Sequence, residues 1–99
     1  MEVFARYEAR ETITDREQVL ALRQIVGAHL QRMFESGKVR ASGLFADVRG
    51  GFFVVDVDSS DELFEMFAPV LDQVRIETHP LTTVEKLREF FERDVAASG

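Results

Sequence analysis

The order in which strand-like and helix-like stretches alternate constrains this chain more than any other feature of its sequence. Glu2 to Glu8 alternates its side chains between two faces, one of them wholly apolar, and this predicts a β-strand. Thr14 and Glu17 have the capping-box spacing and precede a stretch with apolar residues at three- and four-residue steps, which predicts an amphipathic helix. That helix is expected to end near Ser36-Gly37, because glycine readily adopts the left-handed conformation that closes many helices.

A hairpin is predicted next. Val39 to Val48 and Phe52 to Asp58 both read as strands, and the second has the strongest strand composition in the chain. The stretch between them contains Gly50 and Gly51, which we interpret as the residues of the turn.

The remaining elements are a helix, a strand and a further helix. Ser59 and Glu62 form a second capping box, and Pro69 should bound or distort the helix that they open. Val74 to Pro80 predicts a fourth strand, and a C-terminal helix is expected at about 83–97. The apolar stripe of this last helix comprises Val84, Leu87, Phe91 and Val95, with Phe90 beside it.

The order β-α-β-β-α-β is that of the ferredoxin-like split βαβ pattern, an α+β fold. We therefore expect one domain over residues 1–99, with an antiparallel sheet of strand order 4-1-3-2 and the C-terminal helix added. Both internal helices of such a fold cover the same face of the sheet. The other face stays open, and a functional site is expected there.

Composition excludes several classes of function. The chain has 12 basic against 18 acidic residues, a net charge of −6, so no positive field would attract a nucleic acid. It contains no cysteine, which excludes disulfides and thiolate metal sites. No apolar run approaches the roughly 20 residues of a membrane span, and the first residues do not resemble a signal peptide. We expect a soluble cytoplasmic protein that binds no membrane.

The open face is predicted to combine aromatic rings with charged groups. Apolar walls with a few polar side chains are typical of small-molecule sites. The alternative is a solvated sheet on which Arg6, Arg75 and Glu77 form cross-strand ion pairs. Alternation along the strands assigns to this face Phe4, Arg6, Glu8, Phe52, Val54, Asp56, Arg75, Glu77 and His79. It also assigns Ser42 and Leu44 to the face if the second strand keeps that register.

His79 is the strongest single candidate for chemistry, because an unperturbed imidazole titrates near neutral pH. It lies two residues after Glu77 on the same strand face and directly before Pro80, which favours an extended backbone. Glu77 would serve as a base if burial raised its pKa. The alternatives are a solvent-exposed histidine at a strand end and a plain salt bridge from Glu77 to Arg6.

The second histidine, His29, lies beside the apolar stripe of the first helix, and we interpret it as a packing residue. Two histidines on separate elements, without metal-ligand spacing, predict no metal site. The sequence contains no dinucleotide or phosphate-loop fingerprint.

Several motifs between Gly37 and Leu81 occur in a recognisable order. They are Gly37-Lys38-Val39, the strand Val54-Val55-Asp56-Val57-Asp58, the helix start Ser60-Asp61-Glu62-Leu63, Pro69, and a fourth strand ending R-I-E-T-H-P-L. In this order, over about half the chain, they resemble the muconolactone isomerase-like branch of the dimeric α+β barrel superfamily.

The resemblance implies a dimer. In these families two ferredoxin-like protomers bring their open sheet faces together and enclose a cavity. The isomerases among them shift a proton along a small unsaturated lactone without a metal or organic cofactor. We therefore expect a homodimer or higher homo-oligomer, a small-molecule ligand and no cofactor.

The functional hypothesis is a cofactor-independent proton-shift isomerase or cyclase acting on a small cyclic oxygenated substrate. His79 and Glu77 would move the proton. The expected substrate-binding residues are Phe4, Arg6, Arg40, Ser42, Leu44, Phe52 and Arg75. The alternatives are a non-catalytic metabolite-binding or assembly module with the same dimeric barrel, and a cofactor-free monooxygenase.

Overall fold

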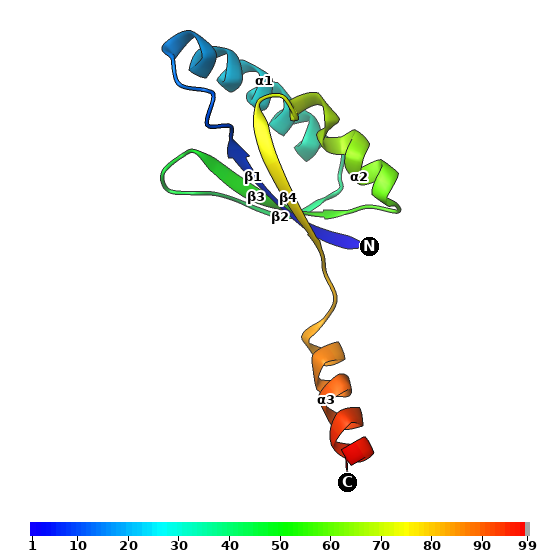
Figure 1. Cartoon of the computed structure of the whole chain (residues 1–99). Helices are drawn as coiled ribbons and strands as arrows, with labels where there is room; N and C mark the ends of the chain where they lie inside the picture. The colour runs from blue at the N-terminus through cyan, green and yellow to red at the C-terminus, as the bar shows by residue number, and fades with distance from the viewer. Residues whose placement is uncertain (99) are drawn as a thin grey trace.

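The structure is a computed structural model that describes residues 1–98 (Figure 1). The elements follow the predicted order, and a C-terminal helix follows them. The strands are β1 (Glu2–Ala9), β2 (Val39–Leu44), β3 (Gly50–Asp56) and β4 (Val74–Pro80). The helices are α1 (Arg16–Glu35), α2 (Ser60–Phe67), a short 3₁₀ helix η1 (Ala68–Val70) and α3 (Val84–Ser98).

The four strands form one antiparallel sheet in the order β2-β3-β1-β4, which confirms the predicted α+β topology. Helices α1 and α2 both lie on one face of this sheet (Figure 1). Strands β2 and β4 are therefore the two edges. Val39, Val55, Val3 and Pro80 pair across the four strands and mark one row of the sheet.

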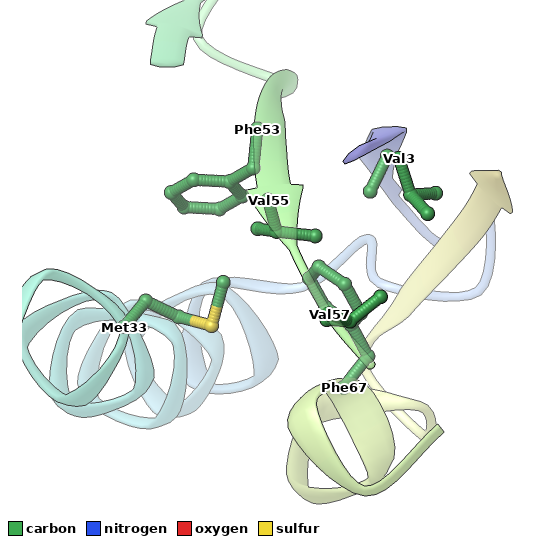
Figure 2. Packing of buried hydrophobic residues seen from close by; sticks show 7 residues of the cluster. Val3, Met33, Phe53, Val55, Val57 and Phe67 are labelled. Carbon is green, nitrogen blue, oxygen red and sulfur yellow. The ribbon is translucent and has the colours of Figure 1, made fainter. Parts of the chain in front are cut away.

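The hydrophobic core lies between the sheet and these two helices. Val3 and Val55 are completely buried, and Met33 of α1 and Phe67 of α2 pack against the same cluster (Figure 2). Phe53 is 2% exposed and completes the centre of the core. Alternate residues of β1 and β3 thus face the helices, as the two-residue period predicts.

Helix α1 begins one residue later than the Thr14–Glu17 capping box predicts. Asp15 is the N-cap, and its carboxylate accepts a hydrogen bond from the backbone N–H of Gln18 at 2.7 Å. The Gln18 side chain in turn accepts one from the backbone N–H of Asp15 at 3.3 Å, so the reciprocal pair is Asp15–Gln18. The predicted end is confirmed, since Gly37 has a φ of 73° directly after the helix.

The hairpin between β2 and β3 differs from the prediction. Strand β2 ends at Leu44, and the following residues form the turn, with Val48 at a φ of 56°. Gly50 and Gly51 are not turn residues: both lie in β3 and are buried. They lie opposite Glu8 and Tyr7 of β1, and a Cβ atom on Gly50 would collide with the Tyr7 backbone. These glycines allow two strands to approach closely.

Helix α2 has the predicted N-cap but only half of the predicted capping box, because the Glu62 carboxylate accepts its hydrogen bond from the backbone N–H of Asp58, at 2.7 Å, and not from that of Ser59. The hydroxyl of Ser59 accepts a hydrogen bond from the backbone N–H of Glu62 at 3.1 Å. The helix gives way to η1, which contains Pro69, so the predicted boundary is confirmed.

Replacing Ser59 with alanine is expected to lower the free energy of unfolding by about 1 kcal/mol, because one backbone donor of α2 loses its partner. Ser60→Ala is the matched control, since Ser60 is the first helical residue and not the cap. Chemical denaturation of the two variants measures the difference. Equal stability of the two would contradict the role of Ser59.

Helix α3 extends away from the sheet beyond the end of β4 (Figure 1). The molecule is consequently elongated, with extents of 63 × 26 × 22 Å and a radius of gyration of 17.4 Å, against about 13 Å for a compact chain of this length. In the part of the chain that the structure describes, no helix has the length and apolar character needed to cross a membrane.

Candidate functional site

The face of the sheet opposite α1 and α2 carries the candidate site. Phe4 of β1 pairs with Val54 of β3 on one side and with His79 of β4 on the other. Arg6, the next residue on that face, pairs with Phe52 and with Glu77. Because directly paired residues point to the same face, these side chains lie together, as their alternation along β1, β3 and β4 predicts.

Aromatic rings form the floor of this site. The rings of Phe4 and Phe52 stack with centroids 5.5 Å apart and planes at 24°, and the His79 ring lies 6.3 Å from the Phe4 ring. The Phe52 ring also covers Gly43 of β2, where a Cβ atom would lie 3.0 Å from its Cζ. The result is a flat apolar platform with an imidazole at one side.

His79 and Glu77 form a hydrogen-bonded pair on the same strand. The distance from His79 Nε2 to Glu77 Oε1 is 3.0 Å, and the side chains are 58% and 60% exposed. A carboxylate only accepts hydrogen bonds, so Nε2 carries the proton and donates it. Nδ1 of a neutral His79 is then the ring nitrogen that can accept a proton.

Arg6 makes a contact that the sequence did not indicate. Its guanidinium lies over the ring of Phe45, 5.2 Å from the ring centroid, and among the described residues it forms no ion pair with Glu77. The alternative of an Arg6–Glu77 salt bridge is therefore wrong. Phe45 lies just beyond the end of β2. The predicted strand Val39 to Val48 included it, but the alternation that puts Ser42 and Leu44 on the open face puts Phe45 on the opposite face.

Arg40 and Arg75 do not join the His79–Glu77 pair. Arg40 bonds to Asp56 at 3.0 Å and to the carbonyl of Gly37, while Arg75 bonds to Glu11 at 3.3 Å. Hydrogen bonds from the N-terminal ammonium and from Arg40 lower the pKa of Asp56. Arg75 lies opposite Glu8, two residues before Glu77 on β4, and is therefore outside the group formed by Phe4, Arg6, Glu77 and His79.

Ser42 and Leu44 were expected on the open face, and this expectation is wrong. A β-bulge between Val39 and Ala41 inserts Arg40 as an extra residue and reverses the alternation along β2. Ser42 consequently pairs with Phe53, whose side chain lies in the core, and both predicted residues line a cavity on the helix side with Phe34 of α1.

His29 packs in the interior as predicted. It is 4% exposed, and its Nε2 lies 2.8 Å from the carbonyl oxygen of Met66, which links α1 to α2. Beside it, an open cavity of about 340 Å³ between these helices is lined by polar as well as apolar groups, including Arg32 and Glu65. This cavity is the alternative to the open face as a small-molecule site.

A salt bridge at the rim of that cavity leads to a pH prediction. Glu62 of α2 pairs with Lys38, and the hydrogen bond from Lys38 lowers the pKa of the Glu62 carboxyl. A pKa that is lower in the folded than in the unfolded state stabilises the protein above the unfolded value, about 4.3 for glutamate. The free energy of unfolding is therefore expected to fall as the pH drops below about 4.

Glu62→Gln is expected to flatten this acid dependence, and Glu65→Gln, one turn further along α2, serves as the matched variant. Urea denaturation between pH 7 and pH 3 measures the slope. An unchanged slope in Glu62→Gln would contradict the assignment.

The described residues include no group of three or more histidine, cysteine, aspartate or glutamate side chains placed to hold a metal ion. Comparison with protein-family models found no match, and a search of curated proteins found none either.

Proposed function

We propose that this chain is a cofactor-independent enzyme that shifts a proton on a small cyclic oxygenated substrate, with His79 and Glu77 as the groups that move it. The observation that carries the proposal is the 3.0 Å hydrogen bond between these two side chains, beside the stacked rings of Phe4 and Phe52. The resemblance to the muconolactone isomerase-like branch supports the same reaction class.

Each group has a chemical role in this proposal. Glu77 holds the Nε2–H of His79 and stabilises the imidazolium that forms when Nδ1 removes a proton from the carbon next to the substrate carbonyl. The imidazolium then returns the proton at the other end of the shifted double bond, so no net proton is gained or lost. Arg6 is the cation on the same face that would balance the negative charge of the intermediate enolate.

The exposure of the His79–Glu77 pair supports the inclusion of a second copy of the chain in the proposal. His79 and Glu77 are both more than half exposed in one chain, and water competes with the substrate there. A second copy, laid face to face at the ordinary distance of about 10 Å between packed sheets, would exclude that water. We therefore include a homodimer in the proposed function.

A non-catalytic metabolite-binding module is the second candidate. The observation that favours it is the engagement of Arg40 by Asp56 and of Arg75 by Glu11, which leaves Arg6 as the only predicted substrate-binding arginine not held in an ion pair within the described residues. A site that binds through rings and one cation requires no proton transfer.

Solvent exchange distinguishes the two candidates. The intact chain is incubated in D₂O with a panel of five- and six-membered unsaturated lactones, each with and without a carboxylate side chain, and deuterium incorporation next to the carbonyl is followed by NMR. Accelerated exchange of at least one lactone is expected. Binding without accelerated exchange would favour the metabolite-binding module, and neither binding nor exchange would contradict both.

A further inference from the structure

The apolar stripe of α3 is exposed in a single copy of the chain. Leu87, Phe90 and Phe91 are each more than half exposed, and Val84 is 80% exposed. The chain as a whole exposes 7146 Å², against about 5,700 Å² expected for a compact monomer of its mass. This excess, about 1,400 Å², is larger than the roughly 800 Å² that each partner buries in a stable interface.

An apolar groove lies on the helix side of the sheet, between α1 and the edge strand β2. Two cavities of about 240 Å³ each share Tyr7, Leu30 and Leu44 in their walls, so they form one continuous groove, which we call the α1–β2 groove. Phe34 and Leu44 on its walls are 56% and 66% exposed. A helix laid there would cover the part of the sheet that α1 and α2 leave bare.

The dimensions of α3 match this groove. The α1 wall runs from Leu22 to Phe34, about 18 Å at 1.5 Å per residue. Helix α3 has 15 residues and is about 22 Å long.

The charges match as well. Arg23 on α1 and Arg49 on the turn before β3 line the same end of the groove, and neither forms an ion pair within the described chain. At 3.6 residues per turn, Glu92 and Asp94 lie on opposite sides of Phe91, near the C-terminal end of the α3 stripe. Asp94 lies between Leu87 and Phe90, and Glu92 lies on the other side of Phe91. The C-terminal end of the stripe is therefore acidic and complements the two arginines at one end of the apolar groove.

A chain cannot place its own α3 in its own groove. Val39 of β2 and Pro80 of β4 lie in the same row on opposite edges of the sheet, three strand spacings or about 14 Å apart. Residues 81–83 connect β4 to α3 and span about 10 Å at most. Leu81 is moreover held by the hydrogen bond from its N–H to the carbonyl of Glu2, at 2.9 Å. The groove is therefore reached only by another molecule.

We propose that α3 docks in the α1–β2 groove of a second copy of this chain, and that two copies exchange their α3 helices reciprocally. Each copy has one α3 helix and one α1–β2 groove. Two copies related by a two-fold axis would therefore fill both grooves and form a closed dimer. This interface involves neither His79 nor Glu77 and is distinct from the open-face pairing in the proposed function, although both require a homodimer.

Charge reversal in two separate chains tests the exchange. The arm variant carries Glu92→Arg and Asp94→Arg, and the groove variant carries Arg23→Glu and Arg49→Glu. Light scattering at micromolar concentration should give a dimer for the unaltered chain. Like charges would meet in each variant alone, which is expected to raise its dissociation constant about tenfold or more.

Mixing the two variants should restore the dimer, because each altered surface then meets its complement in the other molecule. Restoration also shows that both variants are folded. Arg93→Glu, on the side of α3 opposite the stripe, is the matched control and should dimerise like the unaltered chain.

Three results would overturn the inference. The first is a monomeric unaltered chain, with α3 then free or folded against its own α2–β4 surface. The second is a dissociation constant that neither reversal changes, which would leave pairing of the open faces, and with it the proposed function, intact. The third is failure of the mixed variants to associate.

Discussion

Replacing His79 or Glu77 with glutamine is expected to lower kcat/KM for lactone proton exchange by about 10²–10⁴-fold, the usual contribution of a positioned acid or base. The His79 variant removes the ring nitrogen that accepts the proton. The Glu77 variant keeps the size of the side chain but replaces the carboxylate that holds Nε2–H at 3.0 Å and stabilises the imidazolium. Because the two groups act together, the double variant should be little worse than either single one.

Glu8→Gln provides the matched control for Glu77→Gln. Glu8 lies on the same face of the sheet and pairs with Arg75, two residues along the strands from the Arg6–Glu77 pair. Its replacement should leave the exchange rate close to that of the unaltered chain. Full activity in both the His79 and the Glu77 variants would exclude the His79–Glu77 pair as the proton-transfer group, whichever lactone is used.

Replacing Gly50 with valine is expected to lower the free energy of unfolding by about 3 kcal/mol or more. A Cβ atom at this position would collide with the carbonyl oxygen of Tyr7 and lie 3.0 Å from the Cα of Glu8. Both obstacles are backbone atoms of the central strand β1, so they cannot rotate away as a side chain could. A loss of this size is a large fraction of the 5–15 kcal/mol typical of a small domain.

Gly27→Ala is the contrasting change. Gly27 lies within α1, and a Cβ atom there would meet nothing within 4 Å. The alanine should raise the free energy of unfolding by about 0.5–1 kcal/mol, because glycine loses more conformational freedom in a helix. Chemical denaturation measures both changes. A Gly50→Val chain as stable as the unaltered one would contradict the close approach of β3 to β1.

The sequence predicts most of the fold because its signals are local. Strand β4 has the predicted bounds, and the Ser59 cap lies where the spacing placed it, since each depends on a few neighbouring residues. The same holds for the faces of β1, β3 and β4, where alternation is uninterrupted and separates Phe4 and Phe52 from the core.

The errors arise where the structure depends on contacts between distant segments. The bulge at Arg40 moves Ser42 and Leu44 to the helix side, and no residue pattern within β2 indicates this bulge. Gly50 is needed for the approach of Tyr7, more than forty residues away, although a pair of glycines between strands is also typical of a turn. Phe45 was missed as the partner of Arg6 for the same reason.

The local sequence pattern did not predict the position of α3 either. Its apolar stripe correctly indicates an amphipathic helix, but periodicity does not show which surface covers the stripe. The geometry of the sheet is needed for that, because β2 and β4 lie at opposite edges and the α1–β2 groove is therefore out of reach of the chain's own α3.

NMR mapping of ligand binding tests most directly whether the small-molecule site lies on the open face of the sheet. The intact, isotope-labelled chain is titrated with the same unsaturated lactones. We predict chemical-shift changes concentrated at Phe4, Phe52, Glu77 and His79, which lie together on this face. Changes concentrated instead around His29 and Met66, in the cavity between α1 and α2, would contradict this placement of the site.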